Sequence, residues 1–135
     1  MIVIDTHIWI WYTDGGTKLP PEYRDYVADN VATGIGVSAI SCWEVAKLAE
    51  GGRLQFAVLV QDWIANALSL PGIIALDITP QIAVDSVQLP GSFHKDPADR
   101  LIVATAREAN CPLVTLDLAI HAYPHVLFPP GLAKP

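Results

Sequence analysis

The chain is 135 residues long, with 52% hydrophobic and 16% charged residues, which predicts one compact soluble domain and excludes a disordered chain. Its net charge of −6 argues against a nucleic-acid surface built from Lys and Arg, unless the acids gather around divalent cations. No apolar run approaches the ~20 residues that span a bilayer, and the N-terminus reaches an acid too early for a signal peptide, so we expect a cytoplasmic protein without membrane contact.

The first half of the chain predicts two strands with helices after them. Residues 2–4 are an apolar, β-branched run that is typical of a buried parallel strand, and residues 6–12 have a helical pattern. A Pro-Pro pair begins a second helix over residues 20–27. Residues 34–38 predict the second strand, and residues 39–50 predict a helix that a Gly-Gly pair ends.

The second half continues this alternation. Residues 59–70 and 80–89 predict helices on either side of a third strand at residues 73–78. Residues 111–116 predict a fourth strand that leads to an acid, and residues 126–128 predict a short fifth strand.

Strands that alternate with helices predict an α/β fold. We expect one domain over residues 1–135, with a mostly parallel sheet of four or five strands and a loose tail at residues 130–135. Cys42 and Cys111 lack the Cys-x-x-Cys spacing, so we expect reduced core thiols rather than a disulfide or a zinc site.

One long helix is predicted to begin at Asp96-Pro97-Ala98-Asp99. Asp96 suits the N-cap position, and Pro97 suits the first helical position, where its missing N–H would be unpaired anyway. Asp99 then lies in the first turn, where the helix dipole favours a carboxylate.

Acids follow several predicted strands or open the helices beside them. In a parallel sheet these positions lie at one edge, so the acids meet there if the first, second and fourth strands are neighbours. The residues concerned are Asp5, Glu44, Asp96, Asp99 and Asp117. Carboxylates packed this closely repel one another, and Mg²⁺ or Mn²⁺ would relieve that repulsion. Such ions activate water and neutralise the charge of a phosphodiester, so the pattern predicts metal-dependent phosphodiester hydrolysis.

Each acid also has a structural interpretation. Asp5 and Asp117 are candidate N-caps like Asp96, and Ser41-x-x-Glu44 matches a capping box. Lys47, Lys95 and Arg100 lie near the acids and either surround a bound polyanion or pair locally with neighbouring carboxylates.

The histidines and tryptophans have both structural and functional interpretations. The four histidines form no compact ligand pattern, although His7 is a candidate to contact a phosphate or to pack near the acids. Trp9 and Trp11 lie two residues apart and therefore point to different sides of a helix, so one of them is a candidate to face a partner.

Four segments together resemble the PIN-domain ribonucleases, and most closely the VapC-type toxins of prokaryotic type II toxin–antitoxin modules. The segments are Asp5-Thr6-His7, residues 38–47, residues 96–106 and residues 114–117, in the order that the family has them. The resemblance extends over about residues 1–130.

The resemblance implies a three-layer α/β/α domain that acts as a metal-dependent endoribonuclease and hydrolyses RNA. It implies that an acidic quartet is catalytic and binds one or two Mg²⁺ or Mn²⁺ ions, namely Asp5, Glu44, Asp99 and Asp117. Asp96 is an additional outer ligand in this view, and Thr6 supplies a supporting hydroxyl. The implied partners are an RNA substrate, with tRNA and mRNA as candidates, a small antitoxin protein and a second copy of the chain.

Two other functions also fit the sequence. One is a structure-specific DNA nuclease of related fold, although the chain lacks long basic insertions that would grip a duplex. The other is a non-catalytic protein-binding module in which the acids only cap helices.

Overall fold

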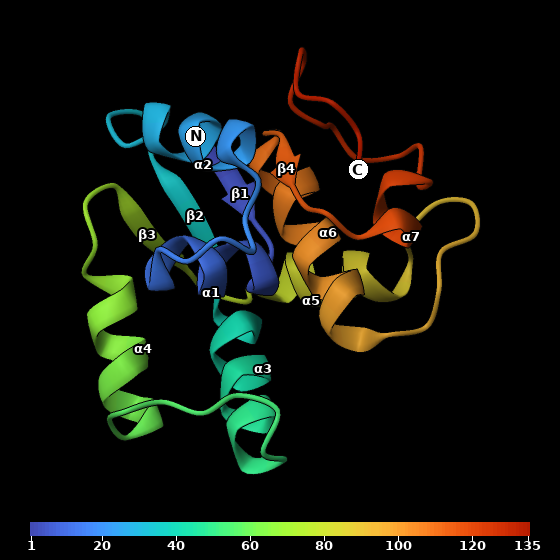
Figure 1. Cartoon of the computed structure of the whole chain (residues 1–135). Coiled ribbons are helices and arrows are strands. Elements are labelled where there is room, and N and C mark those ends of the chain that lie inside the picture. Colours follow the sequence, from blue (N-terminus) through green and yellow to red (C-terminus); the bar gives the residue numbers. More distant parts are fainter.

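A four-stranded parallel sheet forms the centre of the molecule in a computed structural model that describes residues 1–135 (Figure 1). The strands are β1 (Ile2–Ile4), β2 (Ile35–Ser38), β3 (Ile73–Leu76) and β4 (Leu113–Val114). Their order in the sheet is β3-β2-β1-β4, so β1 lies between β2 and β4. The acids that follow these three strands are thereby brought to one edge, as the prediction required.

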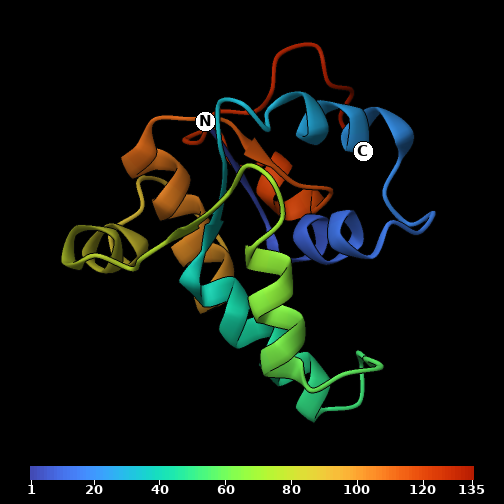
Figure 2. The same cartoon turned by 90° about the vertical axis from the view of Figure 1, so that its left-hand side faces the viewer.

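Seven helices connect and cover the strands. They are α1 (Thr6–Asp14), α2 (Pro21–Asp29), α3 (Ala39–Glu50), α4 (Val60–Leu68), α5 (Pro80–Val87), α6 (Pro97–Ala109) and α7 (Leu118–His121). The helices α3 and α4 lie side by side and extend away from the sheet (Figures 1 and 2). No helix is both long enough and apolar enough to cross a membrane.

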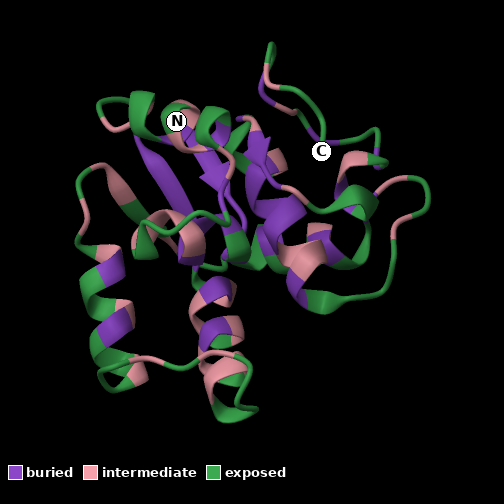
Figure 3. Cartoon of the chain, viewed as in Figure 1, coloured by how far each residue is buried: buried purple, intermediate pink, exposed green.

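Two apolar clusters fill the space on the two faces of the sheet. Ile2 and Ile4 of β1 belong to the cluster that α1, α2 and α4 cover, whereas Val3 belongs to the cluster that α5, α6 and α7 cover. The alternation follows from the strand period of two, which points successive side chains to opposite faces. Figure 3 shows the buried residues gathered on β1, β2 and β4 and on the inner sides of the helices, whereas β3 at the edge of the sheet is only partly covered. The expected three-layer α/β/α architecture is confirmed.

The end of the chain differs from the prediction. The fourth strand contains two residues, not six, and residues 126–128 form no strand, so the predicted fifth strand is wrong. One main-chain hydrogen bond joins this segment to β4, from the Leu113 amide to the Leu127 carbonyl at 2.9 Å. In the tail, the Ala133 carbonyl accepts a hydrogen bond from the Tyr23 hydroxyl at 2.7 Å.

Candidate active site

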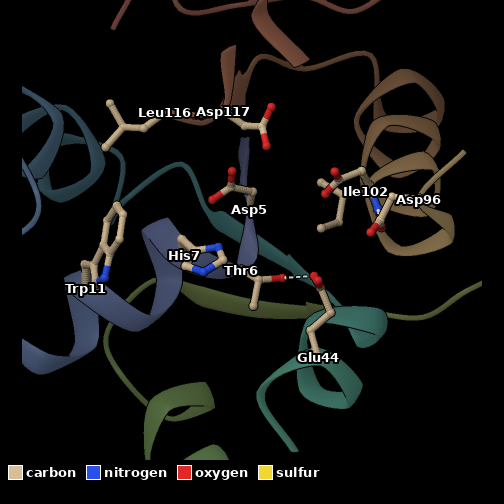
Figure 4. Close-up of a pocket in the computed structure, with 10 residues that line it drawn as sticks. Asp5, Thr6, His7, Trp11, Glu44, Asp96, Ile102, Leu116 and Asp117 are labelled. Atoms are coloured by element: carbon tan, nitrogen blue, oxygen red, sulfur yellow. Dashed lines mark hydrogen bonds between the residues drawn. The ribbon is translucent and has the colours of Figure 1, made fainter. Parts of the chain in front are cut away.

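A cavity of about 450 Å³ opens at the carboxyl edge of the sheet (Figure 4). Its walls come from Asp5 after β1, from α1 and α3, from the start of α6 with its N-cap, and from the segment between β4 and α7. The lining residues are Asp5, Thr6, His7, Trp11, Glu44, Asp96, Asp99, Ile102, Leu116 and Asp117. All five acids predicted to meet therefore reach the same cavity, and no Lys or Arg lines it.

Asp5 is the most deeply placed of these acids, with 7% of its surface exposed. It caps α1, because its Oδ1 accepts a hydrogen bond from the Ile8 amide at 2.9 Å. Its Oδ2 accepts a hydrogen bond from the buried Thr115 hydroxyl. The predicted capping role is confirmed, and the two bonds together fix the orientation of the carboxylate that faces the cavity.

Glu44 is not part of a capping box, so that interpretation of Ser41-x-x-Glu44 is wrong. The helix α3 begins after Ser38, whose hydroxyl accepts a hydrogen bond from the Ile40 amide at 3.2 Å. Glu44 therefore lies in the second turn, where capping no longer explains a carboxylate.

Buried hydroxyls hold the Glu44 carboxylate instead. Thr6 Oγ1 lies 2.5 Å from Glu44 Oε1 and 2.9 Å from Ser41 Oγ. A hydroxyl carries only one proton, and the closer carboxylate oxygen is a stronger acceptor than a hydroxyl oxygen, so Thr6 donates to Glu44 and accepts from Ser41. Sequence reasoning assigned Thr6 a supporting role but missed Ser41, which the misplaced capping box had absorbed.

Asp96 and Asp99 have separate tasks at the start of α6. Asp96 Oδ1 accepts a hydrogen bond from the Asp99 amide at 3.0 Å, so the predicted N-cap is confirmed. The Asp99 side chain caps nothing, and its Oδ2 lies 3.2 Å from Nε2 of His94.

Asp117 caps the short helix α7, as predicted. Its Oδ1 accepts hydrogen bonds from the amides of Ala119 and Ile120 at 2.8 and 3.1 Å. The Asp117 amide in turn donates to Thr115 Oγ1 at 3.0 Å. Thr115 thus connects the acid after β1 to the acid after β4, a role that sequence reasoning missed because the only signal was a threonine two residues before Asp117.

The crowded acids perturb each other's ionisation. Burial raises the pKa of Asp5 and of Glu44 above their ordinary values, although the hydroxyls bonded to them act in the opposite direction. Burial, followed by the charges of Asp96, Asp117, Glu44 and Asp5, raises the pKa of Asp99 to about 7. The site therefore holds more negative charge than it accommodates easily, which is the condition that a cation would relieve.

Lys47, Lys95 and Arg100 do not line the cavity, so they do not form the ring around the acids that was one of their two interpretations. Lys47 pairs with Glu50 on the exposed side of α3 at 3.4 Å. Arg100 points into a loop and donates hydrogen bonds to four main-chain carbonyls, those of Ser86, Val87, Phe93 and His94. Arg100 therefore fixes the segment that carries His94 rather than a substrate.

Replacing Arg100 with Ala is expected to lower the free energy of unfolding by about 2–4 kcal/mol, because four carbonyls lose a charged donor. Urea unfolding followed by circular dichroism measures this change. Arg53→Ala is the matched control, since Arg53 is exposed, and it should leave stability within about 0.5 kcal/mol. Equal stability of the two variants would contradict the role given to Arg100.

The side chains fit a hydrated cation better than a closed metal cage. No three of the His, Cys, Asp and Glu side chains converge closely enough to ligate one ion directly. The cavity nevertheless presents oxygen ligands alone on its acidic walls, which are the ligands that Mg²⁺ and Mn²⁺ prefer. Mg²⁺ usually keeps several of its waters, so it does not require every ligand to touch it.

Known proteins are similar to this chain in sequence. Residues 2–126 match the PIN domain family. The chain is 36% identical over 126 residues to Ribonuclease VapC22 of Mycobacterium tuberculosis, and the match covers 92% of each protein.

Three solved structures share the fold. VapBC2 from Rickettsia felis, bound to a DNA fragment from its promoter, matches with a TM-score of 0.69 and 19% identity over 96% of this chain and 98% of that one. A toxin–antitoxin complex from Klebsiella pneumoniae matches with a TM-score of 0.65 and 20% identity over 94% and 96%. FitAcB from Neisseria gonorrhoeae matches with a TM-score of 0.63 and 23% identity over 96% and 98%.

Proposed function

This chain belongs to the PIN-domain family, and from that premise we propose that it is a VapC-type endoribonuclease, the toxin of a type II toxin–antitoxin module. The observation that carries the proposal is the meeting of Asp5, Glu44, Asp99 and Asp117 in one cavity. These acids come from four different segments, and helix capping explains only Asp5 and Asp117. Their convergence with Glu44 and Asp99 favours a chemical role over a structural one.

The four acids are proposed to hold one or two Mg²⁺ or Mn²⁺ ions, with Asp96 as an outer ligand. When bound, such an ion supplies activation of water at neutral pH and neutralises charge on the phosphate. A cation would also favour the ionised form of Asp99, whose pKa is otherwise raised to about 7.

The surrounding residues hold the acids in place before any substrate arrives. Thr115 and the Ile8 amide orient Asp5, and Thr6 orients Glu44. The short helix α7 orients Asp117 through its first amides. Fixed oxygen positions of this kind reduce the reorganisation that RNA hydrolysis would otherwise require.

The proposed partners are a small antitoxin, RNA and a second copy of the chain. The antitoxin is supported by the fold that this chain shares with proteins solved as toxin–antitoxin complexes. The antitoxin would bring a cationic side chain, since an Arg can bind carboxylates in place of a metal ion. The exposed Leu59 and Val87 side chains fit apolar faces that the antitoxin or the second copy covers.

Removal of divalent cations is expected to abolish cleavage of total RNA, and added Mn²⁺ is expected to restore it. Gel analysis of RNA incubated with the protein in excess EDTA, and then in excess Mn²⁺, measures both changes. Full cleavage in EDTA would overturn the metal-dependent mechanism.

Two further measurements separate the proposed function from its alternatives. Calorimetric titration with Mn²⁺ should give binding, whereas a module whose acids only cap helices should give none. Cleavage of single-stranded RNA, tRNA and branched DNA should favour the RNA substrates. Preferential cleavage of branched DNA would instead support the DNA nuclease.

A further inference from the structure

Trp11 occupies a different environment from the other three tryptophans. Trp9 is fully buried in the core, and Trp63 is buried and stacks with Phe56 at a ring-centroid distance of 4.8 Å. Trp43 is 56% exposed but does not line the cavity. Trp11 is half-buried and forms part of the cavity wall. It is therefore the one tryptophan that both contacts the core and faces the acids.

His7 extends this aromatic wall. His7 and Trp11 lie four residues apart, so they share one side of α1, and their ring centroids are 5.5 Å apart. Figure 4 shows both rings on α1, on the side of the cavity opposite Glu44 and Asp96. The cavity thus has one aromatic side and one acidic side.

The charge of the cavity explains why an aromatic wall matters for RNA. Proteins usually gain affinity for nucleic acid from Lys and Arg that contact phosphates, but no such residue lines this cavity. The nearby Arg100 is committed to main-chain carbonyls. Stacking of a base on an aromatic ring adds affinity without any positive charge on the protein.

We infer that Trp11, together with His7, is a stacking platform for an unpaired nucleobase next to the phosphate that is cut. This inference rests on the proposed function and deepens it, because it predicts that the substrate is RNA with unstacked bases at the cleavage site. A base within a duplex is already stacked on both faces and is not available to Trp11. The same RNA sequence should be cut well as a single strand and poorly as a duplex.

The first test is a steady-state comparison of Trp11→Leu and Trp11→Phe on a single-stranded RNA oligonucleotide that the unaltered protein cuts. Leu keeps apolar contact with the core but removes the aromatic face, so we expect KM to rise roughly 5- to 100-fold, the effect of losing one stacked base. The turnover number kcat should change little, because the lost contact binds ground state and transition state alike. Phe retains an aromatic face and should restore most of the affinity.

Trp43→Leu is the matched control, since it removes an exposed tryptophan that lies outside the cavity, and its KM should equal that of the unaltered protein. Thermal unfolding of all variants detects any loss of folding. An active and folded Trp11→Leu variant with an unchanged KM overturns the stacking inference alone.

A second test locates the base. A series of the same oligonucleotide carries one abasic nucleotide at successive positions around the cleavage site. One position should raise KM for the unaltered protein but add nothing for Trp11→Leu, because both changes remove the same contact. Additive effects at every position contradict the inference. An unaltered protein that cuts no RNA in Mn²⁺ overturns both this inference and the proposed function.

Discussion

Replacing Asp5 with Asn is expected to lower the kcat for RNA cleavage by more than about 100-fold while the fold stays intact. Even outer partners of a metal site are worth 10–100-fold in activity or metal affinity, and Asp5 is proposed to bind the ion itself. Asp5 is also the buried acid at the centre of the site, between the segments after β2 and β4.

The Asn substitution separates the chemical role of Asp5 from its structural role. Asn is as good an N-cap as Asp, so its side-chain oxygen can still accept from the Ile8 amide. In the unaltered protein the Thr115 hydroxyl donates to Asp5 Oδ2, and in the variant the Asn amide nitrogen can donate to Thr115 Oγ1 instead. The charge is lost but the hydrogen bonds at α1 are preserved.

Single-turnover cleavage of RNA in Mn²⁺ measures the loss, and circular dichroism with thermal unfolding checks the fold. The control is Asp25→Asn, which changes an exposed carboxylate on α2 far from the cavity lining and should retain full activity. If the Asp5→Asn protein is folded and cuts RNA as fast as the control, Asp5 is only a helix cap.

The sequence was sufficient to predict which residues meet, but not how they are held. Asp5, Asp96 and Asp117 were predicted as N-caps, because their positions before helices depend on local pattern alone. The bond from Thr115 to Asp5 joins residues 110 positions apart. Only the order β2-β1-β4 brings them together, and no local signal specifies that order.

The helix predicted over residues 39–50 is confirmed, but the capping box assigned to Ser41 and Glu44 is wrong for a physical reason. Ser38 and Ser41 are both acceptable N-caps, and the sequence offers a Glu three residues after the second one. The helix begins at the first serine because β2 ends there, and Ser41 is buried against Thr6. Tertiary packing thus decided between two local signals of similar strength.

The end of the sheet was overpredicted for a related reason. Residues 111–116 and 126–128 are apolar enough for strands, but pairing with β1 extends only over Val114 and Leu113. Leu116 does not pair with β1 but lines the cavity, and the Thr115 hydroxyl donates a hydrogen bond to Asp5. Strand β4 is therefore short because the residues after Val114 contribute to the site and not to the sheet.

Replacing Asp99 with Asn is expected to inactivate the protein and yet to stabilise its metal-free form at pH 8 by about 1–3 kcal/mol. The pKa of Asp99 is raised from 3.8 to about 7 by burial and by the neighbouring acids. Between these two pH values the folded protein binds more protons than the unfolded chain, so its stability falls as pH rises through this window. Asn does not titrate and avoids this loss. The full shift would correspond to about 4 kcal/mol, and we discount it because solvent and the shared charges screen the carboxylate.

Divalent cations should reverse the order of stability. A ligand that binds only the folded state stabilises it in proportion to the logarithm of its concentration over its Kd, and the unaltered protein should bind Mn²⁺ more tightly than Asp99→Asn. Urea unfolding of both proteins from pH 4 to pH 8 in EDTA, and again at pH 8 with Mn²⁺, measures each part. In EDTA the advantage of the variant should grow between about pH 4 and pH 7 and then stay constant. Asp62→Asn, an exposed carboxylate on α4, should show neither change. A variant that is less stable than the unaltered protein at pH 8 in EDTA would mean that Asp99 supports the fold rather than straining it for a cation.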